Sequence, residues 1–464
     1  MPPAAVRNTA LFIAILAGFL TPFDLSAVTI ALPTLAQEFS MDAIQMGWVS
    51  TAYLLASAVF LVPFGRIADI YGRKRVFATG LSVFTLASFL MILAPSALVV
   101  ILLRVLQGFG SAMIFGTAVA ILTSTTPPEQ RGRALGIYTT AVYLGLSMGP
   151  FFGGILTDHL GWRSIFLVNV PIGLFAVLLI FLYLKGEWAD CRGERFDIGG
   201  SIQYGLTLIC VMYGFSLLPE REGFVLLIAG VVMLVVFIAR ELRIRHPLWN
   251  IRLFAKNRVF LFSNMAALVN YGATFGVTFF LSLYLQYIDG FSPEHTGMIL
   301  VIQPVVMALV SPAAGRLSDR IEAGKIASAG MGLSALSLFL LTFTGSGTPL
   351  PAFLGILVIL GIGLGLFSSP NTNAIMGSVE RCYYGVASGT LGTMRLAGQM
   401  LSMGIAMMVL AIFVGNVQIT PDLYPAFLEG MKICMIIFAV MCTTGIFFSL
   451  VRYGTPAGTG ECPR

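Results

Sequence analysis

Long apolar runs fill most of this chain of 464 residues. A helix needs about 20 mainly apolar residues to cross the hydrocarbon core of a bilayer. We count fourteen runs of that length, and each predicts a membrane-spanning helix. The expected spans cover approximately 8–31, 44–64, 76–94, 97–122, 134–157, 164–184, 199–218, 223–242, 259–287, 294–314, 326–344, 350–375, 385–414 and 428–451.

Composition agrees with a chain that uses lipid as its solvent. Hydrophobic residues make up 57% of it and charged residues 10%, and its mean hydropathy is +0.91. A soluble domain carries about 25% charged residues. The first run begins near residue 9, with no small-residue cleavage site after it. We therefore expect a retained first span and not a removed signal peptide.

The basic residues predict the orientation of these spans. Cytoplasmic loops of membrane proteins carry an excess of Lys and Arg. With both termini in the cytoplasm, 22 of the 27 Lys and Arg fall on that side. We therefore expect a multi-pass protein of the cell membrane, either plasma or inner, with cytoplasmic N- and C-termini. The net charge of +6 then faces anionic lipid headgroups and needs no nucleic-acid partner. The exceptions are Arg104, Arg395, Arg163, Arg221 and Lys432.

Two loop sequences indicate an internal repeat. "GRIADIYGRKRV" begins at Gly65, and "GRLSDRIEAGKI" begins at Gly315. Gly65 and Asp69 match Gly315 and Asp319, which lie 250 positions later. A second match at a similar offset favours duplication over chance. It pairs Gly132, Ala134 and Gly136 with Gly385, Ala387 and Gly389.

The repeat predicts an all-α membrane protein of six spans, two central spans and six spans. We place an N-terminal half at 1–184, two additional helices with basic cytoplasmic connections at 185–258, and a C-terminal half at 259–464. Two parallel repeats in a membrane enclose a cavity near the midplane and rock about it. The central pair has no counterpart in this scheme and is expected to be an insertion.

One carboxylate lies well inside a predicted span. Asp24 stands in "TPFDLSAVTIALP", although a charge at the bilayer centre costs at least about 2.5–3.5 kcal/mol. The only cation inside the spans of the same half is Arg104, which shares a helix face with Gln107. We expect Asp24 to take a proton from outside and release it inside, with Arg104 biasing the two states. The alternative is a static ion pair that holds helices together.

The loop after the second span is a candidate cytoplasmic gate. Asp69 can accept hydrogen bonds from a helix N-terminus, or it can pair with Arg73, Arg131 or Arg133. Such contacts would hold the cytoplasmic face closed in one conformation and break in the other. The alternative is that the basic cluster only keeps the loop inside. The gating set is Gly65, Asp69, Gly72, Arg73 and Arg133.

Small residues recur along the fifth span. Gly145, Gly149 and Gly153 follow one another every four residues, so they form one stripe on the helix, and Pro150 and Gly154 lie beside them. Small residues let membrane helices approach closely. The stripe therefore predicts tight packing against a neighbouring helix.

Taken in order, these motifs resemble the major facilitator superfamily over nearly the whole chain. "GRIADIYGRKR" looks like its second-to-third-helix loop signature. "LRVLQGFGSA", with Arg104 and Gln107, resembles the fourth-helix signature, and "GLSMGPFFGG" resembles the fifth-helix signature of its antiporters. "GWRSIFLVNVPIG", "MRLAGQ" and the central pair further resemble the fourteen-helix drug:proton antiporter branch.

The resemblance implies a major facilitator-type bundle of fourteen helices, with two pseudo-symmetric six-helix halves and two inserted helices. It implies a proton-coupled antiporter that exports lipophilic small molecules, cationic drugs among them, by alternating access. It also implies that the fifth-span glycines form a hinge that seals against proton leak. Some members of the branch carry several membrane acids, whereas here only Asp24 lies well inside a span. That departure weakens the case for dicationic substrates.

Polar residues within the apolar spans are the candidates for the substrate cavity. Each could instead join helices to one another. Aromatic residues at 12% and the 21 Met suit a broad, adaptable pocket, but Phe and Met also face lipid. The cavity candidates are Gln107, Asn270, Tyr271, Gln303, Asn371, Asn373, Arg395 and Gln399.

Other classes of function were weighed against antiport. A dedicated transporter of one metabolite or organic ion, or a facilitator without antiport, remains open. A channel would need repeated pore-lining charges, and a membrane enzyme would need a metal set or a nucleophile within the spans. No GxxxxGK[ST] motif is present, so we expect a proton gradient, not ATP, to supply the energy. We expect no cofactor, no metal, free cysteines, protons and a small molecule as substrates, and function as a monomer.

Overall fold

The computed structural model describes residues 4–127, 130–189, 191, 193–244, 248, 254, 257–318, 320–379 and 384–451. Those residues form α-helices with short 3-10 and π-helical turns, and no strand occurs among them. Fourteen helical segments are long and apolar enough to cross a membrane. The predicted number and type of spans are therefore confirmed.

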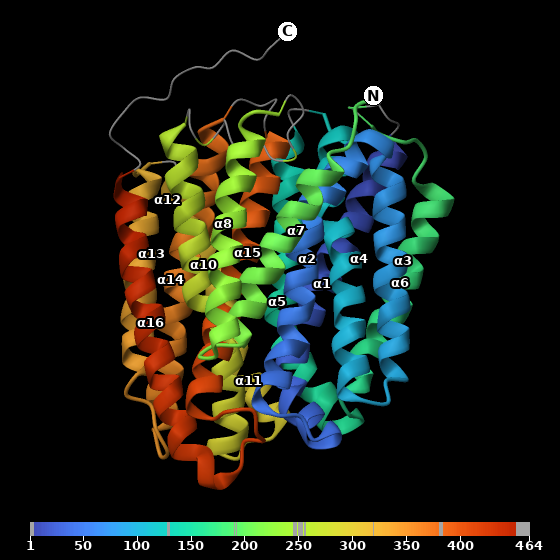
Figure 1. Cartoon of the computed structure of the whole chain (residues 1–464). Helices are drawn as coiled ribbons and strands as arrows, with labels where there is room; N and C mark the ends of the chain where they lie inside the picture. The colour runs from blue at the N-terminus through green and yellow to red at the C-terminus, as the bar shows by residue number, and fades with distance from the viewer. Residues whose placement is uncertain are drawn as a thin grey trace. The chain divides into compact units, whose positions relative to one another are not determined.

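The chain packs as two compact units (Figure 1). Apart from short stretches at 42–44 and 215–223, unit 1 holds α1 to α8 and unit 2 holds α10 to α16. Unit 1 contains α1 (Ala4–Phe39), α2 (Ala43–Tyr71), α3 (Arg73–Ile92), α4 (Ala97–Thr125), α5 (Arg131–Leu160), α6 (Arg163–Tyr183), α7 (Ile198–Ser216) and α8 (Arg221–Glu241). Unit 2 contains α10 (Arg258–Leu283), the π-helical turn η2 (Tyr284–Ile288), α11 (Pro293–Leu300), α12 (Ile302–Ser318), α13 (Ala323–Leu341), α14 (Leu350–Gly377), α15 (Tyr384–Phe413), the 3-10 turn η4 (Pro421–Leu423) and α16 (Tyr424–Val451).

The same set of helix contacts occurs in both units. In unit 1, α1 packs on α4, α5 and α6, and α3 packs on α4 and α6. In unit 2, α10 packs on α14, α15 and α16, and α13 packs on α14 and α16. Each six-helix half is thus built on one plan, which confirms the two pseudo-symmetric halves. The predicted boundaries at 184 and 258 stay predictions.

Close backbone contacts repeat as well. In unit 1, Gly80 of α3 meets Gly110 of α4, and in unit 2, Gly330 of α13 meets Gly363 of α14. A Cβ atom added to any of the four would come closer than 3.0 Å to the carbonyl oxygen of its partner glycine. Real Cβ atoms do not approach backbone that closely. The duplication that two loops indicated in the sequence therefore extends to the packing of helices.

The first helix is longer than predicted. It continues to Phe39, whereas the apolar run predicts an end near residue 31. Pro33 lies inside the helix, which continues beyond the apolar run. The additional turns carry Glu38, which accepts a hydrogen bond from Trp162 Nε1 (2.6 Å) and pairs with Arg163 (2.7 Å). This contact ties the end of α1 to the start of α6.

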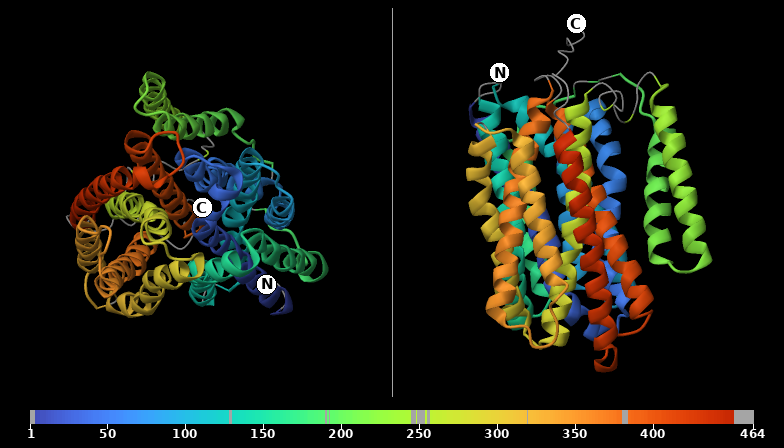
Figure 2. Two further views of the ribbon diagram at one scale, coloured as in Figure 1. Left: turned by 90° about the horizontal axis from the view of Figure 1, so that it is seen from below. Right: turned by 90° about the vertical axis from the view of Figure 1, so that its left-hand side faces the viewer.

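The two additional helices pack on α2 within unit 1. Tyr204 of α7 donates a hydrogen bond to the backbone oxygen of Ala58 (3.2 Å) and packs against Phe237 of α8. At one end of the pair, Arg240 of α8 makes two hydrogen bonds to Asp197, at 2.7 and 2.8 Å. Figure 2 shows α7 and α8 as a hairpin at the edge of their unit.

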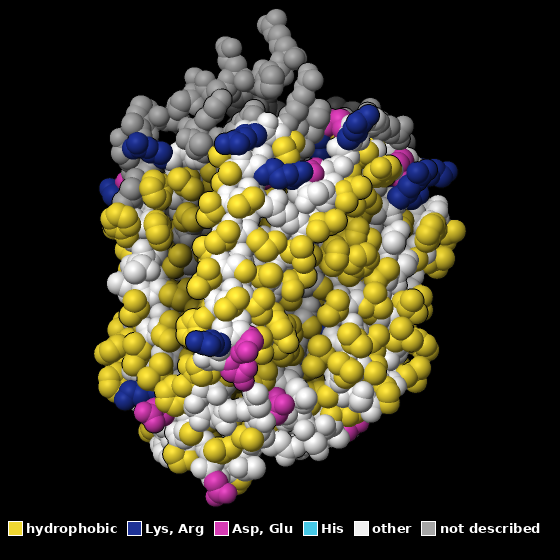
Figure 3. All heavy atoms as spheres, in the orientation of Figure 1, with side chains coloured by type: hydrophobic (Ala, Val, Ile, Leu, Met, Phe, Trp, Pro, Cys, Tyr) yellow, Lys and Arg dark blue, Asp and Glu magenta, His cyan; other side chains and the backbone are white. Residues whose placement is uncertain are grey.

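The surface agrees with a lipid environment. Large apolar side chains such as Phe181, Ile228 and Leu309 are exposed along the helices. In Figure 3 hydrophobic side chains cover the flank of the molecule, and Lys and Arg gather mainly toward the upper end. Exposed apolar side chains of this kind would be unstable in water and are favourable against lipid acyl chains.

Candidate functional site

A fully buried ion pair lies inside unit 1. Asp24 of α1 and Arg104 of α4 are both 0% exposed. Arg104 Nη1 lies 2.5 Å from Asp24 Oδ2. The structure thus brings together the two charged residues that the sequence placed inside spans of the N-terminal half.

Uncharged side chains complete the surroundings of the carboxylate. Asn169 of α6 donates a hydrogen bond from Nδ2 to Asp24 Oδ1 (2.7 Å), and Gln107 Nε2 lies 3.4 Å from the same oxygen. Gln107 also accepts from Arg104 Nη1 (2.9 Å) and donates to Ser88 Oγ of α3 (2.9 Å). Helices α1, α4 and α6 therefore meet at a single acidic group, and α3 is joined to it through Gln107.

Arg104 is held from a second side by α2. Its Nε donates to the backbone oxygen of Val49 (3.1 Å), and its guanidinium lies 4.4 Å from the centre of the Tyr53 ring. Tyr53 in turn donates to Ser111 Oγ (2.8 Å). Arg104 Nη2 has no hydrogen-bond acceptor among the described residues. The cation is therefore fixed by groups that do not depend on the charge of Asp24.

This arrangement suits a group that changes its charge. Two desolvated charges stabilise each other, but removing one leaves the other buried and uncompensated, which is strongly destabilising. Protonation of Asp24 would remove its charge, and Arg104 would keep its contacts with Val49, Gln107 and Tyr53. These three contacts would offset part of the cost of a buried guanidinium when Asp24 is neutral.

Three of the groups in this cluster were not among the sequence candidates. Asn169, Ser88 and Tyr53 reach the pair from three different helices. Asn169 is the one polar residue in the apolar run that follows Ser164 on α6. The criterion that selected Asn270 in the other half, a polar amide within a span, would also have selected Asn169. Single hydroxyl groups are too common in membrane helices to be singled out in this way.

The predicted gating loop lies at the junction of α2 and α3. Arg73 binds Asp69 through Nε (2.9 Å) and Nη2 (2.6 Å), and its Nη1 donates to Ser124 Oγ of α4 (2.6 Å). Gly72 joins the two helices with φ of 124°, a conformation that favours glycine. Arg131 donates to the backbone oxygen of Thr126 and not to Asp69. The side chain of Arg133 and all of Asp319 lie outside the described residues.

The connection between α6 and α7 covers this loop. Glu187 accepts a hydrogen bond from the backbone N–H of Lys74 (2.8 Å) and lies 3.5 Å from Arg75. Glu194 pairs with Arg66, whose Nη1 also lies 3.3 Å from the thiol of Cys191. Burial raises the pKa of that thiol. The sequence predicts a basic connection here, but its acidic residues Glu187 and Glu194 are the ones that bind the basic loop.

The glycine stripe of α5 faces α1. A Cβ on Gly145 would meet the backbone of Phe19, and one on Gly149 would meet the side chain of Ser26. Gly153 lies against Ala27 in the same way. Gly154 is buried, and Pro150 lies inside the helix. The tight packing predicted for the stripe is therefore present, and the hinge stays a prediction.

The predicted cavity residues do not form one cluster within a unit. Gln107 belongs to the buried ion pair described above. In unit 2, Asn371 donates to the backbone oxygen of Ser263 (3.1 Å), and Asn373 donates to Ser318 Oγ (2.8 Å). Of the remaining candidates, Asn270 and Gln399 are buried, Tyr271, Gln303 and Arg395 are half-buried, and the Arg395 guanidinium lies 5.8 Å from the centre of the Tyr271 ring.

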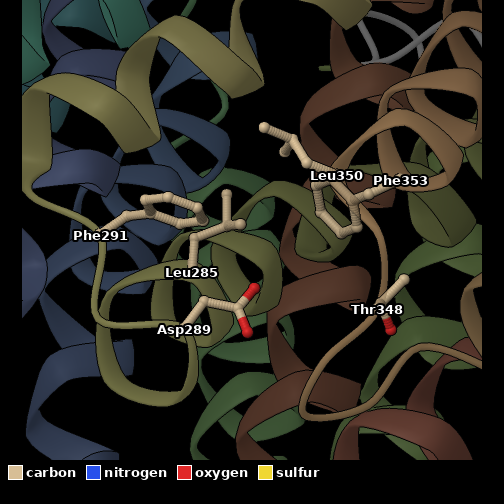
Figure 4. A pocket seen from close by; sticks show the side chains of 6 residues that line it. All are labelled: Leu285, Asp289, Phe291, Thr348, Leu350 and Phe353. Carbon is tan, nitrogen blue, oxygen red and sulfur yellow. The ribbon is translucent and has the colours of Figure 1, made fainter.

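Unit 2 contains a separate small cavity of about 220 Å³ (Figure 4). Among the described residues that line it, Asp289 is the one ionisable group, and its pKa is raised because the carboxyl group is partly buried. Figure 4 shows Leu285, Phe291 and Phe353 around the same space. None of the predicted cavity residues lines it. The full lining is Leu285, Asp289, Phe291, Thr348, Leu350 and Phe353.

The four cysteines in the described part of the chain are free. They are Cys191, Cys210, Cys434 and Cys442. No group of three or more His, Cys, Asp or Glu in the described residues could hold a metal ion. Cys382 and Cys462 lie outside those residues.

Comparison with known proteins identifies the family and the fold. The family model of the Major Facilitator Superfamily matches residues 14–403. The riboflavin transporter RibZ of Clostridioides difficile (strain 630) is 32% identical over 380 residues, 81% of this chain and 82% of RibZ. The cephamycin export protein CmcT of Amycolatopsis lactamdurans is 33% identical over 472 residues, 98% of this chain and 95% of CmcT.

A solved structure supports the same assignment at the level of fold. It is the inward-facing, unoccupied crystal structure of a bacterial homolog to the human lysosomal transporter Spinster. The two chains share 18% sequence identity with a TM-score of 0.71, over 97% of this chain and 98% of that one. The protein is therefore a membrane transporter and not an enzyme, and it belongs to the Major Facilitator Superfamily.

Proposed function

We propose that this transporter is a proton-coupled antiporter that exports lipophilic small molecules, singly charged cations among them, by alternating access. The observation that carries the proposal is the fully buried Asp24–Arg104 pair at the meeting point of four helices of unit 1. Ionisable groups kept inside a membrane bundle commonly mark proton or substrate pathways. The relative CmcT, named as an export protein, supports the direction of transport.

In this mechanism Asp24 is the group that gains and loses the proton. When the carboxylate is charged, Arg104 Nη1 and Asn169 Nδ2 bind it. When a proton from outside neutralises it, the attraction between α1 and α4 weakens, while Val49 and Gln107 still hold the guanidinium. The strength of the α1–α4 contact thus depends on protonation, and this dependence would couple the proton to the conformational change.

The cytoplasmic loop supplies a candidate gate for the same cycle. The Asp69–Arg73 pair joins α2 to α3 and, through Ser124, to α4. Charge-assisted bonds at a helix junction are strong enough to hold one conformation and are reversible. The basic residues of this loop also support cytoplasmic termini and a cell-membrane location. No cofactor is required in this scheme, and the protein would work as a monomer.

A dedicated transporter of one metabolite is the second candidate. The relative RibZ carries the name riboflavin transporter and covers most of this chain. Riboflavin is larger and more polar than the lipophilic cations of the first proposal. A substrate panel that contains riboflavin, neutral lipophilic compounds and the cation tetraphenylphosphonium distinguishes the two. Uptake or export of a single member of the panel would favour the dedicated transporter.

The proposed coupling is tested with Asp24→Asn in proteoliposomes that carry an imposed pH gradient. We expect export against a concentration gradient to fall to the level of empty liposomes, because asparagine cannot exchange a proton. Proton release on substrate addition to the purified protein should disappear with it. Facilitated movement down a gradient can remain, since the asparagine oxygen still accepts a hydrogen bond from Arg104.

Asp158→Asn is the matched control, because Asp158 is an exposed acid at the end of α5. That variant should export at the wild-type rate. Uphill export by Asp24→Asn at the wild-type rate would rule out Asp24 as the proton carrier.

A further inference from the structure

The motif "GWRSIFLVNVPIG" spans the start of α6 and has two separate sets of contacts. At its beginning, Arg163 pairs with Glu38 of α1. Deeper in the helix, Asn169 is 0% exposed, and its Nδ2 donates to Asp24 Oδ1 (2.7 Å). The contact of Arg163 holds the N-terminal end of α6, and the contact of Asn169 reaches Asp24, the proposed proton site.

Asn169 Oδ1 has no hydrogen-bond partner among the described residues, although the atom is buried. Buried amide oxygens are nearly always paired in folded proteins. A carboxylate only accepts hydrogen bonds, so charged Asp24 must face the NH₂ group of the amide, and the oxygen is then left over. A protonated carboxyl group is a donor and would require an acceptor instead. A turn of the amide about its Cβ–Cγ bond would bring Oδ1 to that place.

Gln107, the other amide in the cluster, cannot make the same exchange. Its Oε1 accepts from Arg104 Nη1 (2.9 Å), and arginine has donors only. A turned Gln107 would present its NH₂ group to the guanidinium. Asn169 makes no such contact with Arg104 in the described structure, so its amide is the one that can serve both states of Asp24.

The charged and titratable groups near Asp24 come from few helices. Arg104 of α4 binds it, and Tyr53 of α2 lies against Arg104. On α5, Tyr138 faces Gly18, which lies roughly 9 Å along the axis of α1 from Asp24. In the part of the chain that the structure describes, α3 and α6 contribute only uncharged groups at this depth. A change at Asn169 therefore acts on Asp24 without removing a charge.

We propose that Asn169 is a positioning residue of the proton site, whose amide donates to charged Asp24 and, after turning, accepts from protonated Asp24. The inference rests on the proposed role of Asp24. The amide stabilises each protonation state in turn, so it sets the pH at which the carboxylate exchanges its proton. It also transmits that exchange to α6, a helix that carries no charge at this depth.

The test is the pH dependence of transport and of proton release by Asn169→Leu, a variant with the same branching at Cγ and without polar atoms. Both states of Asp24 lose a hydrogen bond in this variant, but the charge-assisted bond to the carboxylate is the stronger of the two, so the midpoint should move by about one pH unit to higher pH. Infrared difference spectra give a second readout that does not require transport. The carbonyl band of protonated Asp24 should lie at a different frequency in Asn169→Leu than in the wild type, because the carboxyl group loses the acceptor of its hydrogen bond. The same band should be absent in Asp24→Asn.

Two further variants keep the test decisive. Asn169→Gln retains the amide and should return the midpoint toward that of the wild type, which a merely structural role would not require. Asn264→Leu is the matched control, since Asn264 is a buried asparagine of α10 that donates to a backbone oxygen (2.8 Å). It should leave the midpoint unchanged.

The outcomes separate this inference from the proposed function. If Asp24→Asn abolishes coupling while Asn169→Leu keeps the wild-type midpoint and carbonyl band, Asn169 has no role in positioning. If Asp24→Asn leaves coupling intact, the proton site itself is elsewhere. If Asn169→Leu does not fold, Asn169→Ser takes its place, because serine lacks the amide and has a shorter side chain. A wild-type midpoint and carbonyl band in Asn169→Ser would then overturn the inference.

Discussion

The carboxylate of Asp24 illustrates how a membrane bundle keeps a charge in its interior. Arg104 neutralises it, and Asn169 and Gln107 supply neutral donors. In a low-dielectric interior, such a pair costs about as much to desolvate as it returns by attraction. Its presence therefore adds little to stability, which leaves a functional reason for keeping it.

A double-mutant cycle on the pair tests that view. Arg104→Leu alone should lower the free energy of unfolding by about 3–5 kcal/mol, because Asp24 is left buried without its cation. Asp24→Leu together with Arg104→Leu should recover much of that loss, since no charge is left unpaired. Thermal unfolding of the purified proteins in detergent measures both effects. Losses that simply add would show that the two side chains act independently.

The sequence predicted the charged members of the site and Gln107, and it missed Asn169, Ser88 and Tyr53. Asp24 and Arg104 were identifiable because charges are rare and costly within spans. Gln107 followed from its spacing to Arg104 on one helix face. Asn169 comes from a helix more than 140 positions away in the chain, and nothing in its local sequence says that it faces Asp24. Contacts between distant helices depend on the rotation of each helix, which an apolar run does not specify.

At the scale of helices, one ion pair fastens an end of the hairpin of α7 and α8. The two hydrogen bonds from Arg240 hold the pKa of Asp197 below its usual value of 3.8, and the backbone N–H of Gly200 adds to this. A carboxylate with a lowered pKa stabilises the fold above its unfolded pKa, and the contribution is lost as the pH falls through the native value.

Asp197→Asn should therefore destabilise the protein in a pH-dependent way. At pH 7 we expect a loss of about 1 kcal/mol, the range of a bidentate pair that is partly exposed to water. The difference from wild type should shrink as the pH falls below about 4. Thermal unfolding at neutral and acidic pH measures it, with Glu222→Gln on the same hairpin as the control. A difference that is constant with pH would contradict the assigned pKa direction.

Helix boundaries were less predictable than helix number. All fourteen spans were found because each contains about 20 apolar residues. The end of α1 was misplaced because the apolar run ends near residue 31, whereas the helix continues through Pro33 to Phe39. The contact of Glu38 with Trp162 lies across 124 positions of sequence, so the additional turns have no local signal.

At the scale of the whole molecule, the repeated glycine contacts provide a test of the duplication. Gly80→Leu in unit 1 and Gly330→Leu in unit 2 should each lower stability by several kcal/mol, because each side chain would be forced against the backbone of the partner helix. The effects should be of similar size, since the contacts are equivalent. Melting temperature and yield of the folded protein in detergent measure them.

Gly136→Ala is the control for both substitutions. A Cβ at Gly136 would meet nothing within 4 Å, and alanine favours a helix by roughly 0.5–1 kcal/mol over glycine. The variant should therefore be as stable as the wild type or slightly more stable. A destabilised Gly136→Ala, or a Gly80→Leu that melts at the wild-type temperature, would show that close approach is not what these glycines provide.

The two units differ in their buried charges, although their helices pack in the same way. Gly108 of α4 meets the backbone of Tyr53, and Gly361 of α14 meets that of Gln303 in the same way. When Gly108 is matched with Gly361, the residue of α14 that corresponds to Arg104 is Leu357. Among the described residues, Asp24 is the one acid deep inside a membrane-length helix.

A single exchangeable carboxylate has an electrical consequence. If one proton enters for each singly charged cation that leaves, no net charge moves, and the cycle responds to the pH difference but not to the membrane voltage. A neutral cargo would make the same cycle electrogenic, and about 2.3 kcal/mol for every 100 mV would then assist each turnover. If the single acid of one half is the proton carrier, as proposed, the charge of the cargo determines which component of the proton-motive force drives export.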